Sequence, residues 1–177
     1  MPTSAMTPFQ SFINLPVISR VRRNHGLEHA TLHILSEHYP GTMLAGHSDI
    51  GGFWLLGDVP TEAVQKAVKE ALQRMKAGEH RLAVHPNCGT NFVISGTLAG
   101  LAGAMVMFGA GRRWRDKLER LPLAFSLSTL ALILSQPLGL LTQERVTTSG
   151  DPGDLTIVDI IPSRRGRVQA HHIITRG

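Results

Sequence analysis

Three histidines and a glutamate fall within nine positions of the segment RNHGLEHATLH, residues 23–33. His25 and His29 are four residues apart, so on a helix they lie on the same face. Glu28 stands one residue before His29, within the same arc of about 100°. This H-x-x-E-H spacing is the inverted counterpart of the H-E-x-x-H zinc motif. It predicts two imidazole ligands for Zn²⁺ or another divalent metal, with Glu28 as the general base.

Two further residues belong to the same segment. His33 is one turn beyond His29, where it is either a partner of the metal ligands or a solvent-side bystander. Gly26 interrupts the expected helix at a cost of about 1 kcal/mol relative to Ala, which predicts a close approach by another backbone or by a substrate. The alternative for the whole segment is a polar helix face that happens to be rich in histidine.

A second segment with metal-binding residue types is HPNCGTNF, residues 85–92. It carries His85 and Cys88, the single cysteine of the chain. A thiolate and an imidazole are suitable additional Zn²⁺ ligands. The alternative is a helix-initiating turn, in which Asn87, Thr90 or Asn91 caps the next helix and Cys88 only packs.

The pair of motifs HGLEH and HPNCGTNF resembles two uncharacterised bacterial membrane-protein families, one of which is described as predicted metal-dependent enzymes. The residues that carry the resemblance are His25, Gly26, Glu28, His29, His85, Pro86, Cys88, Gly89, Thr90 and Phe92. The sequence departs from that pattern at Asn87 and Asn91, where the family more often has Arg and Ser, which puts the substrate in doubt. The resemblance implies a metal site and no particular reaction.

Composition narrows the class of protein. The 177 residues carry a formal net charge of +5, yet only 18% of them are charged and 5% are aromatic. A nucleic-acid binder is normally richer in Lys, Arg and stacking aromatics, so nucleic acid is not expected as a partner. A single cysteine excludes an intramolecular disulfide and fits a reducing compartment.

Two long uncharged stretches predict a transmembrane helical hairpin. Residues 92–110 are 19 positions without a charge, and residues 121–142 are 22, close to the roughly 20 apolar residues that cross a bilayer. The basic segment GRRWRDKLER between them is expected to be an interfacial loop. The alternative is a hairpin in the core of a soluble protein. Three small residues in the first stretch favour close helix packing and a possible homodimer: Gly96, Gly100 and Gly103.

The location follows from the hairpin and the charges around it. The start of the chain shows no basic region ahead of an apolar one, so no cleavable signal peptide is expected. Lys and Arg are nearly balanced between the short loop and the outer flanks, so these charges do not set the orientation. Because export of roughly 90 N-terminal residues without a signal is harder than leaving them inside, we expect an integral protein of the bacterial cytoplasmic membrane with its soluble parts in the cytoplasm.

The remaining sequence predicts a small α/β domain and a terminal β-hairpin. Helices are expected over 16–38 and within 58–79, the second capped by Asp58 or Thr61 and ended by Gly78. Strands are expected over 42–49, 51–58, 81–85, 155–162 and 168–175. The fold class is thus an α+β membrane protein with three parts, at 1–90 (α/β), 91–142 (transmembrane hairpin) and 143–177 (β-hairpin).

Other polar residues are weaker candidates. His47 and Asp49 belong to a turn from which they could reach the site, and Glu79 and His80 could supply a distant ligand or simply end a helix. His171 and His172 are expected on opposite faces of a strand, so one ion cannot bind both without a bulge.

Three functions remain open at this point. The first is a membrane-tethered, metal-dependent hydrolase or peptidase in which His25, His29, Cys88 and His85 hold zinc and Glu28 activates water. The second is a non-catalytic membrane protein whose structural metal site serves assembly or regulation. The third is a cysteine-based acyl enzyme, which would remain active after chelation.

Overall fold

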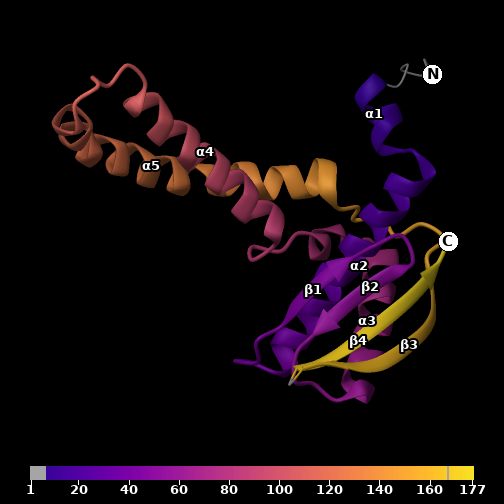
Figure 1. The fold of residues 1–177 in the computed structure, drawn as a ribbon. Helices are drawn as coiled ribbons and strands as arrows, with labels where there is room; N and C mark the ends of the chain where they lie inside the picture. Colours follow the sequence, from indigo (N-terminus) through magenta and orange to yellow (C-terminus); the bar gives the residue numbers. More distant parts are fainter. Residues whose placement is uncertain (1–6, 167) are drawn as a thin grey trace. The chain divides into compact units, whose positions relative to one another are not determined.

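The computed structural model describes residues 7–166 and 168–177. It divides into two compact units (Figure 1). The first consists of the chain up to His85 together with Glu144–Gly177, and the second is Pro86–Gln143. The architecture is mixed α and β, as the sequence predicts.

The first unit is built on a four-stranded antiparallel sheet in the order β1-β2-β4-β3. Its strands are β1 (Ala45–Ser48), β2 (Gly52–Leu56), β3 (Thr156–Arg165) and β4 (Val168–Arg176). Strand β4 pairs with β2, with Trp54 opposite His172. The predicted terminal hairpin is therefore present, and it completes the same sheet as the early strands.

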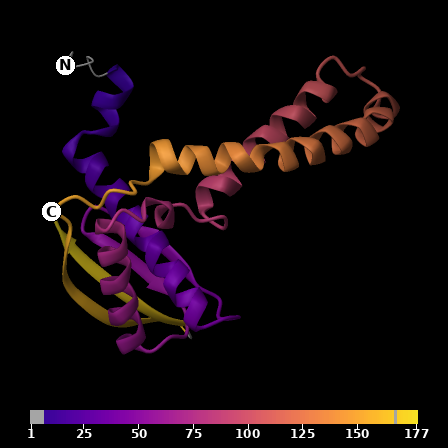
Figure 2. The same ribbon diagram turned by 180° about the vertical axis from the view of Figure 1, so that it is seen from behind.

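Helices α2 (Pro16–His38) and α3 (Thr61–Lys76) cover one face of this sheet (Figure 2). Helix α2 begins at Pro16 and is followed by Tyr39, Pro40 and Gly41, as predicted from the helix-start proline and the stop signal. The core between these layers includes Leu27, Ile34, Phe53, Leu55, Val64, Val68, Met75, Leu155 and Ile173. The apolar stripe of α3 supplies its share of this core at helical spacing.

Two local predictions are wrong. The N-cap of α3 is Pro60 without a side-chain hydrogen bond, because the hydroxyl of Thr61 bonds instead to Nε2 of His171. Residues 81–85 do not form a strand: His80–Ala83 is a short 3₁₀ helix, η1, after which Val84 is extended. A further short helix, α1 (Pro8–Ile13), was not expected.

The second unit is an antiparallel helical hairpin of α4 (Gly89–Met107) and α5 (Trp114–Thr142). A π-helical turn, η2 (Gln143–Thr147), follows α5 and leads into the last segment of the first unit. Both helices are long and apolar enough to cross a membrane. Helix α5 begins at Trp114, so the basic segment predicted as a loop already forms its first turns.

Polar side chains link the two helices along their length. Ser135 donates to Ser95 at 2.7 Å, and the amide of Gln143 donates to Oδ1 of Asn91 at 2.6 Å. Gly103 faces α5, since a Cβ built there would lie 2.9 Å from Oγ of Ser128. Such contacts between small and hydroxyl residues are typical of helix pairs in membranes.

Candidate metal centre

Helix α2 places three of the predicted site residues in the interior of the first unit. His29 is 1% exposed and Glu28 is 3% exposed, while His25 is half-buried. A polar group buried this deeply requires partners. Those partners come from segments distant in sequence.

His25 and His29 lie side by side, with ring centroids 4.4 Å apart. Nδ1 of His29 is 2.8 Å from the carbonyl oxygen of Ala83, and Nδ1 of His25 is 3.0 Å from that of Thr147. A carbonyl accepts only, so in each neutral ring Nδ1 carries the proton and Nε2 carries the lone pair. This is how histidine ligands of metals are usually oriented.

His85 and His33 lie next to this pair, and we call the four residues His25, His29, His33 and His85 the histidine cluster. The ring of His85 lies 5.7 Å from that of His29 and 4.9 Å from that of His33. Nε2 of His33 donates to the carbonyl of Val84 at 2.9 Å. Burial, together with the neighbouring His33 and His29, lowers the pKa of His85 from 6.5 to about 4. His85 is therefore neutral at pH 7, the state in which an imidazole binds a metal.

Glu28 is held against strand β1. The hydroxyl of Ser48 donates to its Oε2 at 2.5 Å. A Cβ built on Gly46 would lie 2.1 Å from its Oε1, so only glycine at that position leaves room for the carboxylate. Burial raises the pKa of Glu28, and the hydrogen bond from Ser48 and the nearby His25 and His47 partly offset that rise.

Gly26 is explained by a close backbone approach. A Cβ built there would lie 2.1 Å from the carbonyl oxygen of Ser149. This confirms the prediction of an approaching backbone and brings residues 147–149 against α2, where Thr147 reaches His25.

Cys88 is the N-cap of α4 and opens the second unit. Its side chain makes no capping hydrogen bond, and the N-cap position is thus held by Cys88 and not by Asn87, Thr90 or Asn91. Asn91 instead donates to the carbonyl of Pro86 at 2.6 Å and shapes the loop that carries the cysteine. Among the described residues, His25, His29 and Cys88 form a His/His/Cys donor set that could hold a metal ion.

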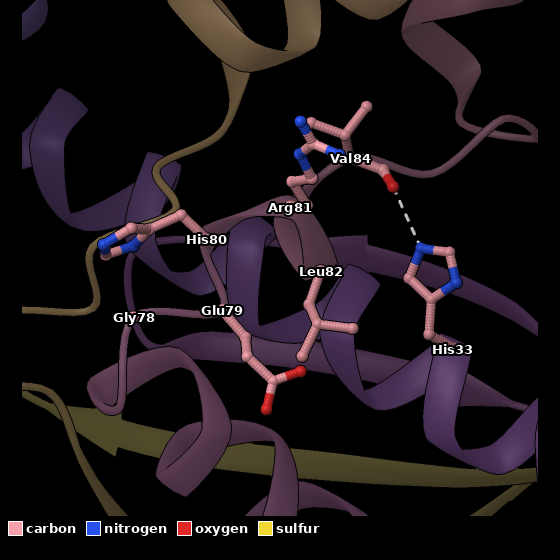
Figure 3. A pocket seen from close by; sticks show the side chains of 7 residues that line it. All are labelled: His33, Gly78, Glu79, His80, Arg81, Leu82 and Val84. Carbon is pink, nitrogen blue, oxygen red and sulfur yellow. Dashed lines mark hydrogen bonds between the residues drawn. The ribbon is translucent and has the colours of Figure 1, made fainter.

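A pocket of about 570 Å³ adjoins the histidine cluster. His33, hydrogen-bonded to Val84, forms one side of it, and Leu82 and Glu79 stand between His33 and His80 (Figure 3). Glu79 is paired with Arg74 and His80 bonds to the carbonyl of Gly150. These two residues therefore line the pocket and have structural partners of their own.

Three of the remaining candidates, His171, His172 and Asp49, have partners of their own outside the cluster. His171 is buried and contacts Thr61, whereas His172 stacks on Trp54 at 4.2 Å on the other face of the sheet, which confirms that they point in opposite directions. Oδ1 of Asp49 accepts from the backbone of Gly51 and Gly52, so it makes the turn.

Sequence reasoning missed the residues that orient the site. Ser48 directly follows His47 in the segment GHSD, which offered a weak signal. The carbonyl groups of Ala83 and Thr147 could not be identified from the sequence, because every residue carries a backbone carbonyl.

Comparison with known proteins gives a family without an assigned activity. Residues 20–160 match a domain of unknown function, DUF6391. An uncharacterized protein of Picosynechococcus sp. is 34% identical over 142 residues, which cover 73% of this chain and 66% of that relative, just under two thirds of its length. No solved structure matches the chain. Since the match spans most of the chain, including the histidine cluster and both apolar helices, the chain belongs to the DUF6391 family.

Proposed function

We propose that the protein is a membrane-anchored, metal-dependent hydrolase in which His25, His29, His85 and Cys88 hold zinc and Glu28 is the general base. One observation carries the proposal: the adjacent imidazoles of His25 and His29 both bond to backbone carbonyls through Nδ1, which directs both Nε2 lone pairs to a ligand. Buried histidines oriented only for packing would not require the same tautomer twice.

Chain connectivity supports the inclusion of Cys88. Three peptide bonds separate Cys88 from His85, so their Cα atoms can be at most about 11 Å apart, whatever the arrangement of the two compact units. His85 already lies against His29. A thiolate with two or three imidazoles is a donor set that zinc prefers.

The chemistry follows from the position of Glu28. When bound, zinc would supply a Lewis acid that polarises an acyl oxygen and makes water easier to deprotonate. Glu28 would accept the proton as the water oxygen attacks the acyl carbon, and would return it to the leaving group as the bond breaks. The raised pKa of this carboxyl makes it a stronger base than an exposed glutamate.

The apolar helices support anchoring in a membrane. Helix α4 has 19 residues, and α5 with η2 forms 34 residues of continuous helix. Only 6% and 17% of their apolar windows are buried, whereas the core helix of a soluble protein would be mostly buried. A lipid or membrane-bound peptide is then the natural substrate, and the pocket beside His33 offers an open side to the site.

A structural metal site is the second candidate, and one observation favours it. His25, His29 and His33 each bond to a carbonyl of another segment: Thr147, Ala83 and Val84. The histidines thus already connect α2 to the segments that precede α4 and follow α5. A metal held by four protein ligands would strengthen that connection without catalysis.

The first test is metal content. We would purify the full chain in detergent without a histidine tag and quantify bound metals beside four variants: His29→Ala, His85→Ala, Cys88→Ser and, as control, His38→Ala. His38 lies on the same helix but is exposed and bonds to the carbonyl of Ile34. We expect near-stoichiometric zinc in the wild type and in His38→Ala, and loss in the other variants. A folded wild type that takes up no zinc when it is offered would refute the proposal.

Cobalt substitution separates the two candidates. A thiolate charge-transfer band that disappears in Cys88→Ser would identify the sulfur ligand. A hydroxamate that changes the cobalt spectrum without removing the metal would show an open coordination position and support catalysis. A spectrum insensitive to hydroxamate would favour the structural site.

A further inference from the structure

One end of the first unit exposes a group of large apolar side chains. Its members are between 48% and 58% exposed: Phe9, Phe12, Leu15, Val17 and Ile50. We call this group the apolar rim. An exposed patch of this kind on an ordered scaffold marks an interaction surface.

Helix α1 holds the first two members in an ordered, amphipathic turn. Thr7 and Gln10 form a reciprocal capping box, with hydrogen bonds of 2.9 and 3.2 Å. Phe9 and Phe12 are three residues apart and share a face, with Gln10 and Ser11 between them in sequence. No residue of α1 is buried, so neither ring serves the core.

Ile50 joins the rim through Arg20. The guanidinium of Arg20 donates to the carbonyl of Ile50 at 2.6 Å and to that of Thr175 at 2.6 Å. The β1–β2 turn is thereby tied to the beginning of α2, next to Leu15 and Val17 in sequence.

The chain that follows α5 meets the first unit at this same end. Arg22 donates to the carbonyl of Thr148 at 2.9 Å, and the backbone N–H of Ser149 donates to the carbonyl of Arg22 at 2.9 Å. Helix α5 ends only six residues earlier, at Thr142. Val17 and Arg22 are separated by about 7.5 Å along α2. If α5 crosses a bilayer, only the short segment between Thr142 and Thr148 therefore separates the bilayer surface from the end of the first unit that carries the apolar rim.

The charge near the rim fits a lipid surface. Residues 7–27 contain Arg20, Arg22 and Arg23 and no Asp or Glu. Arg23 is paired with Asp154, so Arg20 and Arg22, which donate to backbone carbonyls, supply the positive charge. Apolar and aromatic side chains beside basic ones are the composition of segments that lie in the headgroup region, about 5–10 Å deep, and basic residues favour anionic lipids.

We propose that the apolar rim inserts into the interface of the bilayer that the α4–α5 hairpin crosses. The inference rests on the membrane anchoring of the proposed function and extends it to a second contact. This contact would fix the first unit against the membrane and hold His25, about 12 Å along α2 from Val17, close to the lipid surface.

The test uses tryptophan fluorescence in the full chain, reconstituted into vesicles of phosphatidylcholine and phosphatidylglycerol with or without bromine on the acyl chains. In a Trp54→Phe, Trp114→Phe background, single tryptophans replace Phe12, Ser11 or Phe125. Ser11 is the matched control: it is exposed on the polar face of α1 and its side chain is not part of the capping box. Phe125 reports on α5, where it is 65% exposed. We expect bromine to quench most of the emission of F12W and F125W, and much less of S11W.

The outcomes separate the two proposals. Quenching of F125W without quenching of F12W would overturn the rim proposal and leave the membrane hairpin intact; a blue-shifted but unquenched F12W would indicate a protein partner instead. Absence of quenching at F125W would overturn both. Should the tryptophan-free background not fold, a photoreactive phospholipid with the wild-type chain gives the same comparison. Adducts are expected in residues 7–17 and in α4 and α5 but not in α3, and adducts in α4 and α5 alone would overturn the rim proposal.

Discussion

The hydroxyl of Ser48 donates a hydrogen bond to Oε2 of Glu28 at 2.5 Å, and this contact joins a strand residue to the carboxylate on helix α2. The carboxylate is 3% exposed. A hydrogen bond to a buried charged group contributes about 1.5–3 kcal/mol, more than one between neutral groups. The contact therefore fixes the position of the group that we assign as the base, and it favours the ionised form by lowering the pKa that burial raises.

Replacing Ser48 by Ala removes this donor. We expect the free energy of unfolding at neutral pH to fall by about 1–3 kcal/mol, because the carboxylate stays buried without its partner. The pKa of Glu28 is expected to rise further, since the Ser48 hydrogen bond lowers it. Urea unfolding in mild detergent measures the first effect. Ser48→Thr keeps a hydroxyl and should retain most of the stability; equal stability of the Ala variant and the wild type would contradict the assignment.

Gly46→Ala should act on the same contact. The added Cβ would lie 2.1 Å from Oε1 of Glu28, and the flexible carboxylate would move away from Ser48 to avoid it. We expect a loss of about 1–3 kcal/mol that does not add to the loss in Ser48→Ala, because both changes break one interaction. The double variant measures the coupling. Gly51→Ala in the same hairpin, where the nearest atom would be 3.3 Å away, is the control. Fully additive losses would show that the two residues act separately.

Gly26→Ala is expected to affect the metal site as well as the stability of the fold. Here the added Cβ would lie 2.1 Å from the backbone oxygen of Ser149, which cannot swing aside as a side chain does. The segment that includes Thr147 would be displaced from His25, so we expect lower zinc content together with a stability loss of about 1–3 kcal/mol. Gly100→Ala in α4 has no atom within 4 Å of the new carbon, within the described part of the chain, and is the control. Normal zinc content in Gly26→Ala would contradict the proposed link between Thr147 and the site.

Stability should decline in mild acid through His171. Burial lowers the pKa of this imidazole below 6.5 in the folded protein. As the pH falls below 6.5, the unfolded chain takes up a proton that the folded protein binds only at lower pH, so the free energy of unfolding falls until the folded pKa is passed. His85 has the same sign in the metal-free protein, between 6.5 and about 4. Urea unfolding of the metal-free protein over this range should show a smaller pH dependence in His171→Gln, and an unchanged dependence would count against the assignment.

Zinc should stabilise the folded protein by an amount that grows with the logarithm of its concentration relative to its Kd. A ligand present at 100 times its Kd adds about 2.7 kcal/mol. We expect the Tm of chelator-treated protein to rise when zinc is restored, in the wild type and in His38→Ala, and to stay constant in His29→Ala. An equal rise in His29→Ala would place the zinc elsewhere.

The sequence alone determined the local elements and the helical part of the site. Pro16 and the Tyr39-Pro40-Gly41 stop signal predicted where α2 begins and ends. The spacing of His25, Glu28 and His29 predicted that they share a helix face, because a helix repeats every 3.6 residues. The apolar stripe of α3 and the two uncharged stretches likewise predicted helices that the structure contains. Residues 81–85 were wrongly predicted as a strand, because so short an apolar run does not distinguish a strand from a helical turn.

Only the tertiary structure decided what surrounds the histidines. The carbonyls of Ala83 and Thr147 reach His29 and His25 across 54 and 122 residues of sequence, and Ser48 reaches Glu28 across 20. Strand β4 lies between β2 and β3, a pairing of distant segments that no local pattern specifies. Periodicity determines which residues share a face of one helix or strand, whereas contacts between these elements depend on how their faces pack against one another in the folded protein. Candidate ligands could therefore be proposed from the sequence, whereas the backbone groups that orient their side chains could not.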